Sequence, residues 1–136
     1  RVRKIVPEKV WKQRYNQINE FEELLAENRT TIVKFFLHIS KGEQAKRIRD
    51  RIKDDEKNWK FRKSDLEERK LWEDYMAAYE TALDKCNADH APWYIIPSNK
   101  KWFRNLATSE ILVETLTKMD PKIPDPIPDL DKIKVE

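Results

Sequence analysis

Two short apolar runs, set among long helical patterns, constrain the fold of this 136-residue chain most strongly. The first, "TTIVKFFLHI", is rich in β-branched and aromatic residues and nearly continuous, which is typical of a strand buried on both faces. It predicts a strand over Thr31–Ile39. The second run, "APWYIIP" at Ala91–Pro97, lies between polar residues and carries a proline near each end. Because helical patterns separate the two strands, we expect a parallel sheet with helices packed on it.

Start and stop signals bound the helical patterns. Pro7 suits the first turn of a helix, and Asn28 is a plausible end for it. Ser40 followed by Glu43 is a capping box, and Ser64 with Glu67 is a second one. The expected helices run from Pro7 to Asn28, from Ser40 to the break at Asp54, from Ser64 to about Cys86, and from Asn99 to the stop at Pro121.

The predicted architecture is α/β but mostly helical, with two strands and about four helices. Residues 1–120 are predicted to form this unit, and the proline-spaced residues 121–136 an extended tail. Two strands are too few for a parallel sheet covered on both faces. Either a partner supplies the missing strands, or the chain is the second half of a larger α/β domain. We also expect self-association, because the first strand would leave an apolar edge unpaired.

Composition restricts the class of protein. The chain has no apolar run long enough for a transmembrane helix, so no membrane role is expected. Its only cysteine, Cys86, excludes an intrachain disulfide and favours a reducing, cytoplasmic location. With only two histidines besides, no metal site is predicted within the chain. Its only glycine, Gly42, excludes a Gly-rich phosphate loop in these residues.

Positive charge gathers in one segment. Residues 41–63 hold ten Lys or Arg against five Asp or Glu, whereas the whole chain carries a net charge of +3. This local excess favours a polyanion site over general nucleic-acid binding. Ligands of open α/β sheets bind at the carboxyl ends of the strands, where Ser40 and Lys41 begin a capped helix. The alternative interpretation is an ordinary capping box with a solvated basic face.

A second cluster follows in "KNWKFRKSDLEER", where Trp59 and Phe61 alternate with basic residues. Aromatic and basic residues in alternation are typical of surfaces that bind nucleotides or single strands. In the alternative interpretation the two aromatic side chains anchor a loop to the core. Neither pattern alone decides between these possibilities.

Six blocks of sequence follow one another in one order and at close spacing: "RYNQINEFEELL", "KFFLHISKGEQAKR", "EKNWKF", "DLEERKLWEDYMAAYE", "APWYIIP" and "KKWFRNLA". Together these blocks resemble the C-terminal half of the polyphosphate kinase 2 family. The resemblance covers about Arg14 to Pro121 and is far more specific than any single motif. Asp55, where the family usually has a proline, and Gly42, where it tends to carry an acid, depart from the family pattern.

The resemblance implies the C-terminal half of a P-loop kinase-like, three-layer α/β/α domain with a helical lid at about residues 41–75. Such proteins move the terminal phosphate of inorganic polyphosphate to a nucleoside mono- or diphosphate, or run the reverse reaction, with Mg²⁺. Their phosphate loop and metal-binding aspartate precede the region seen here, so the Mg²⁺ ligands would lie outside this chain. A fragment without them is expected to be inactive alone.

The resemblance also implies roles for single residues. Arg47 and Arg69 would be catalytic cations, stabilising charge on the transferred phosphoryl group. Asp65 would orient Arg69 or another lid cation, or be a favourable acid in a first helical turn. The remaining phosphate-binding residues would be Lys41, Lys57 and Lys60. The competing hypothesis is a non-catalytic polyanion-binding or assembly module that uses the basic segment 41–63.

Overall fold

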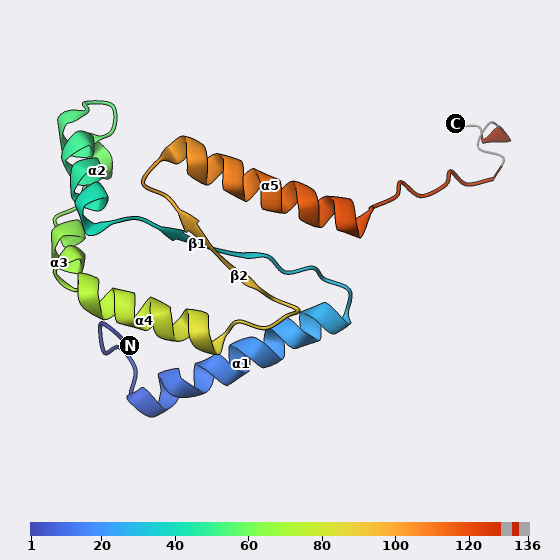
Figure 1. Ribbon diagram of the computed structural model, residues 1–136, viewed down its shortest axis with the longest axis horizontal. Helices are drawn as coiled ribbons and strands as arrows, with labels where there is room; N and C mark the ends of the chain where they lie inside the picture. Colours follow the sequence, from blue (N-terminus) through green and yellow to red (C-terminus); the bar gives the residue numbers. More distant parts are fainter. Residues whose placement is uncertain (129–131, 134–136) are drawn as a thin grey trace.

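Five α-helices and two parallel strands make up the computed structural model, which describes residues 1–128 and 132–133. The α/β class predicted from the sequence is therefore confirmed. Figure 1 shows the strands in the middle, with α5 along one side and α4 and α1 along the other. The elements are α1 (Glu8–Glu27), β1 (Lys34–His38), α2 (Lys41–Lys53), the 3₁₀ turn η1 (Asn58–Lys60), α3 (Ser64–Lys70), α4 (Trp72–Lys85), β2 (Trp93–Pro97) and α5 (Lys101–Met119).

The two strands pair in parallel and in register over five residues. Lys34 lies opposite Trp93, and the ladder continues to His38 opposite Pro97. Both strands are where the sequence predicts them, but each is shorter, because only paired residues form a ladder. The helical crossover between them, from α2 to α4, is what parallel pairing requires.

Helix α1 begins and ends at the predicted residues. Pro7 is its N-cap and Asn28 its C-cap. The Asn28 side chain donates to the Leu24 carbonyl at 2.8 Å, which satisfies one of the carbonyls left over at the helix end. Asn19 on the same helix donates to the Lys85 carbonyl at 2.9 Å and so attaches α1 to the end of α4.

The Lys34 ammonium joins four elements. Its Nζ donates to Glu22 Oε2 and to the Cys86 carbonyl, both at 2.6 Å, and lies 5.1 Å from the centre of the Trp93 ring. The Lys34 and Glu22 side chains are only 11% and 12% exposed. This charge pair therefore fixes α1 and the end of α4 to the start of the sheet.

The prediction of one continuous helix from Ser64 to Cys86 is wrong, because the helix is interrupted at Leu71 and forms two helices, α3 and α4. The break turns Arg69 toward α2, where its guanidinium bonds to the Lys41 carbonyl and the Gln44 side chain. These contacts compete with continuation of a straight helix. The described residues thus hold five α-helices, where the sequence predicted about four.

Two predicted caps are also wrong. The N-cap of α3 is Lys63, with no side-chain bond, rather than Ser64. Asp65 accepts from the Arg62 backbone N–H at 3.3 Å near that helix start instead. Helix α5 starts after Lys100 rather than at Asn99, because the Asn99 side chain bonds across the sheet edge.

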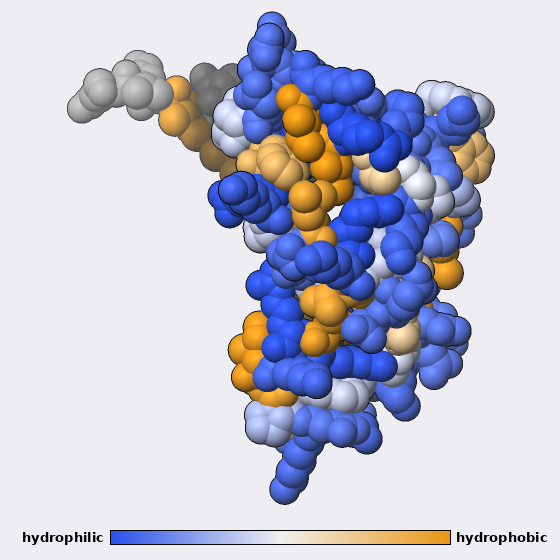
Figure 2. Space-filling model, turned by 90° about the vertical axis from the view of Figure 1, so that its left-hand side faces the viewer, coloured by the Kyte–Doolittle hydropathy of each residue, from blue (hydrophilic) through white to orange (hydrophobic). Residues whose placement is uncertain are grey.

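Much apolar surface stays uncovered. The chain exposes 11409 Å², whereas a compact protein of its 16.4 kDa exposes about 7,500 Å². Leu37 in β1 is 49% exposed and Ile95 in β2 is 58% exposed, so the prediction of a first strand buried on both faces is wrong. The described sheet has only these two strands, and the other described residues leave these side chains half exposed. Figure 2 shows apolar residues at the surface between hydrophilic ones, on the side that carries α2 and α3.

Residues 121–127, after α5, form neither helix nor strand, and they are exposed. They lead away from the rest of the molecule (Figure 1). The predicted tail also includes 129–131 and 134–136, which lie outside the described residues. None of the helices described combines the length and the apolar composition needed to cross a bilayer.

Replacing Glu22 by Gln should destabilise the fold, because the Lys34 ammonium would stay nearly buried without its counter-charge. Removing one partner of a buried ion pair typically costs about 3 to 5 kcal/mol. We expect about 3 kcal/mol in the free energy of unfolding, measured by urea denaturation. The matched control, Glu23→Gln on the exposed side of α1, should change it by less than about 0.5 kcal/mol. Equal effects of the two variants would contradict the role given to Lys34.

Candidate functional site: the carboxyl edge of the sheet

Both strands end at the same edge of the sheet, and a helix begins three or four residues after each strand end. His38 lies opposite Pro97 at the last pair of the ladder, and the Ser98 N–H donates to the His38 carbonyl at 2.7 Å. Helices α2 and α5 start from this edge. Ligands of parallel sheets bind at such an edge, where helix N-termini present unpaired N–H groups.

Only half of the capping box predicted at Ser40 and Glu43 is present, because the Glu43 side chain accepts from Arg47 rather than from the Ser40 N–H. The side-chain cap by Ser40 is confirmed. Its hydroxyl accepts from the Glu43 backbone N–H at 3.2 Å and so begins α2. Asn99 adds two bonds from the other strand end: its Oδ1 accepts from the Ser40 N–H at 2.9 Å, and its Nδ2 donates to the Ser40 hydroxyl at 3.3 Å. The start of α2 is therefore attached to the loop that follows β2.

Arg47 makes a third connection across this edge. Its Nε donates to Glu43 Oε1 at 2.8 Å, and one terminal nitrogen donates to the Ser98 carbonyl at 2.7 Å and the Asn99 carbonyl at 3.3 Å. The Arg47 side chain is 26% exposed. The structure thus places Arg47 at the predicted edge, with its guanidinium held by protein groups.

Lys41 and Arg69 contact each other at the first turn of α2, the helix that also carries Arg47. The Arg69 Nη1 donates to the Lys41 carbonyl at 2.7 Å and to Gln44 Oε1 at 2.9 Å, which docks α3 against α2. The Lys41 ammonium lies 3.1 Å from Glu73 Oε1 on α4 and is 46% exposed. Of the six predicted residues, Lys41 and Arg69 are therefore brought into contact, and Arg47 lies on the same helix with its bonds directed to the loop after β2.

The other three predicted residues lie near the far end of α2, about 18 Å along its axis from Lys41. Lys57 pairs with Asp54, and this hydrogen bond lowers the pKa of the Asp54 carboxyl. The Lys60 ammonium lies 5.1 Å from the centre of the Trp59 ring, which is 74% exposed. Trp59 therefore does not anchor this loop to the core.

Asp65 does not bond to Arg69, one of the partners proposed for it from the sequence. Its carboxylate lies 3.8 Å from the Arg51 guanidinium and accepts from the Arg62 N–H. Because the Asp65 side chain is 34% exposed and the Arg51 side chain 40%, this ion pair is a weak one. Asp65 thus contacts another cation of the predicted lid.

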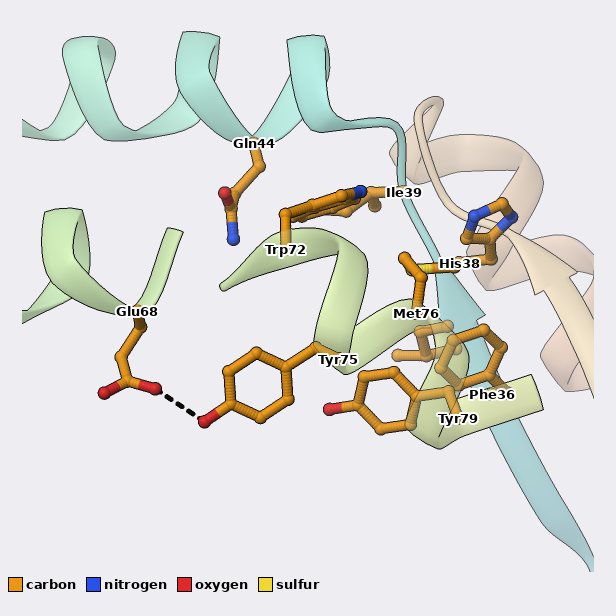
Figure 3. Close-up of a pocket in the computed structure, with 10 residues that line it drawn as sticks. Phe36, His38, Ile39, Gln44, Glu68, Trp72, Tyr75, Met76 and Tyr79 are labelled. Carbon is orange, nitrogen blue, oxygen red and sulfur yellow. Dashed lines mark hydrogen bonds between the residues drawn. The ribbon is translucent and has the colours of Figure 1, made fainter. Parts of the chain in front are cut away.

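An open pocket of about 420 Å³ lies next to the site, and the sequence did not predict it. Figure 3 shows its wall, where the Tyr75 hydroxyl donates to Glu68 at 2.5 Å. Glu68 also pairs with Arg3. The hydrogen bonds from Tyr75 and Arg3 lower the pKa of Glu68, and the Glu68 carboxylate raises the pKa of Tyr75. The pocket is lined by Phe36, Leu37, His38, Ile39, Gln44, Glu68, Trp72, Tyr75, Met76 and Tyr79.

Three aromatic residues of this wall, Trp72, Tyr75 and Tyr79, recur at three- and four-residue spacing in the sequence, which places them on one face of α4. Periodicity cannot say whether such a face meets another element or an opening, so no sequence signal distinguishes this pocket wall from a core.

Comparison with known proteins defines the class. The sequence matches the family Polyphosphate kinase 2 over residues 1–124. The fold matches the crystal structure of Polyphosphate Kinase 2 from Arthrobacter aurescens TC1 with a TM-score of 0.91, at 40% identity, covering 97% of this chain and 47% of that chain. This chain belongs to the polyphosphate kinase 2 family, and its mixed α/β fold is consistent with a P-loop kinase-like domain.

Two curated relatives are especially informative. The AMP/ADP-polyphosphate phosphotransferase of Meiothermus ruber is 51% identical over all of this chain, which covers 51% of that protein. The ADP-polyphosphate phosphotransferase of Rhodopseudomonas palustris is 45% identical over 87% of this chain, covering 41% of that protein. The chain thus spans about half the length of these relatives.

Removing the Arg69 guanidinium should release α3 from α2. In Arg69→Ala the bonds to the Lys41 carbonyl and to Gln44 disappear, and a charge-assisted bond contributes about 1.5 to 3 kcal/mol. We expect backbone amides of residues 64–70 to exchange at least about ten-fold faster, measured by hydrogen–deuterium exchange with mass spectrometry. The control is Arg62→Ala, because Arg62 is an exposed arginine near the start of α3. Equally faster amide exchange in both variants would contradict the role of Arg69 in docking α3 on α2.

Proposed function

We propose that this chain is part of a polyphosphate:nucleotide phosphotransferase. The complete enzyme would move the terminal phosphate of inorganic polyphosphate to a nucleoside mono- or diphosphate, or run the reverse. The observation that carries this proposal is that Lys41 and Arg47 lie on the helix that starts at the carboxyl edge of a parallel sheet, with Arg69 bonded to the first turn of that helix. The names of the relatives, which pair polyphosphate with AMP or ADP, support the substrate class.

The cations in this arrangement suit a bound phosphate chain. The ion pair of Lys41 with Glu73 is exposed, 46% and 82% for the two side chains, so it contributes little and a phosphate oxygen can replace the carboxylate. Arg69 is already fixed by its two bonds to α2, so its guanidinium loses little freedom on binding. Together these groups would hold a polyanion in line and neutralise charge that develops on the transferred phosphoryl group.

Mg²⁺ is part of the proposal for the complete enzyme. This ion prefers carboxylate oxygens and water in octahedral geometry. Among residues 1–128 and 132–133, no three His, Cys, Asp or Glu side chains gather into a metal site. We propose that the ligands of the ion belong to residues outside this chain.

Three further properties belong to the same proposal. The isolated chain would be inactive, because its single glycine leaves it without a Gly-rich phosphate loop. It would form homo-oligomers, which the half-exposed Leu37 on β1 supports. A cytoplasmic location is supported by Cys86, a buried free thiol whose pKa is raised by that burial.

The activity is tested by comparing this chain with a version extended at its N-terminus by the preceding residues of its parent protein. With Mg²⁺, polyphosphate and ADP or AMP, we expect the extended protein to phosphorylate the nucleotide and the chain alone to show no transfer. The measurement is nucleotide product by ion-exchange chromatography. No transfer by the extended protein with any nucleoside mono- or diphosphate would refute the proposal.

The second candidate is a non-catalytic polyanion-binding module, favoured by the exposed Trp59 with the Lys60 ammonium over its ring. If binding alone is the function, Lys41→Ala, Arg47→Ala and Arg69→Ala should weaken polyphosphate binding equally, and the affinity should fall steeply with salt. If the chain serves an enzyme, Arg47→Ala and Arg69→Ala in the extended protein should lower kcat by about a hundred-fold or more while affinity falls less. Isothermal titration and steady-state kinetics on the same variants separate the two.

A further inference from the structure

Asn99 is the only side chain from the loop after β2 that the structure bonds to the cap of α2, among the described residues. The sequence pattern predicted it to cap α5, but that helix begins after Lys100. Instead, Asn99 Oδ1 accepts from the Ser40 N–H, and only an oxygen can face that donor. Its amide Nδ2 then lies toward the Ser40 hydroxyl, which accepts from it and from the Glu43 N–H.

The backbone that carries Asn99 is rigidly held. The preceding residue, Ser98, is 1% exposed; its N–H donates to the His38 carbonyl at 2.7 Å and its hydroxyl to the Ile96 carbonyl at 2.8 Å. On the other side α5 begins within two residues. Because the backbone on both sides of Asn99 is fixed, the Asn99 side chain holds its bonding partner, Ser40, at a fixed place relative to the sheet edge.

Asn99 bonds to Ser40 in the short connection between β1 and α2, which consists of two residues, Ile39 and Ser40. Lys41 follows directly, and its carbonyl is the acceptor for Arg69. A chain of contacts thus leads from the end of β2 through Asn99 and Ser40 to the cations of the site. Arg47, which lies about two turns further along α2, donates to the Asn99 carbonyl at 3.3 Å and so adds a second bond between the helix and this loop.

We propose that Asn99 is a positioning residue for the phosphotransfer reaction: through Ser40 it sets the start of α2, and with it Lys41 and the anchor of Arg69. This inference rests on the proposed function. In this role Asn99 does not contact phosphate. Arg47 contributes to the same positioning through its bonds to the Ser98 and Asn99 carbonyls.

The first test needs no activity. In this chain, Asn99→Ala should remove the acceptor of the Ser40 N–H, so that amide should exchange with solvent about ten-fold faster or more, measured by NMR hydrogen exchange. Asn99→Asp keeps a side-chain oxygen for that N–H, and the Ser40 hydroxyl can turn to donate to the carboxylate. Exchange in Asn99→Asp should therefore stay close to that of the unchanged chain.

The second test measures the reaction in the N-terminally extended protein. Misplacing reacting groups by about 1 Å can lower a rate a hundred-fold. We expect Asn99→Ala to lower kcat by about ten- to a hundred-fold, and Asn99→Asp to restore kcat to within about three-fold. The matched control is Asn105→Ala, because Asn105 lies exposed on α5 and bonds only to the neighbouring Arg104 among the described residues; its kcat should change less than two-fold.

Each outcome bears on the inference. Fast Ser40 exchange together with a low kcat that Asp restores supports it, whereas an unchanged kcat in Asn99→Ala overturns it even if Ser40 exchanges faster. A low kcat that Asp does not restore also overturns it, because acceptor geometry is then not what matters. If the unmodified extended protein shows no transfer, the proposed function fails, and the positioning role fails with it. The exchange data would then establish only that Asn99 bonds to the Ser40 N–H.

Discussion

The five-residue parallel ladder between β1 and β2 is the constraint on which the rest of the structure depends. Because the strands are parallel and in register, they end at one edge, opposite each other at His38 and Pro97. A slip of one residue would move every partner by about 3.3 Å and turn the side chains to the other face. The bond from Ser98 to the His38 carbonyl and the two bonds between Asn99 and Ser40 would then be lost. The attachment of the Ser40 cap and of Arg47 to the loop after β2 therefore depends on this register.

Sequence reasoning works best here where a pattern is local. The Ser40 cap, the Asn28 terminator and the type of each strand follow from a few neighbouring residues, and the structure has all of them. It fails where a distant contact competes with a local one. Asn99 stands where an asparagine usually caps a helix, yet its partner lies 59 residues away in the sequence. The break at Leu71 is similar, because Arg69 beside it reaches back to Lys41.

Burial was the property that the sequence predicted least well. The apolar run of β1 reads as a strand covered on both faces, but the described residues leave Leu37 half exposed. The composition of a strand reflects every neighbour it packs against, including any that these residues do not supply. The same holds for Trp72, Tyr75 and Tyr79, whose spacing fixes a face of α4 but not what lies over it. Periodicity gives the direction of a side chain, whereas burial needs the complete set of neighbours.

The difference between lysine and arginine explains how this edge combines fixed and exchangeable side chains. A guanidinium has five N–H donors in one plane, so Arg69 can bond to the Lys41 carbonyl and Gln44 through Nη1 while its other donors point in different directions. The Lys41 ammonium has three donors on a flexible stem, and its pair with Glu73 is exposed. In the function proposed above, this arrangement would keep the arginines in place before a polyanion arrives and let the lysine respond to it. The arginines would then contribute preorganisation, and the exposed Lys41–Glu73 pair would set how readily Lys41 turns toward a phosphate.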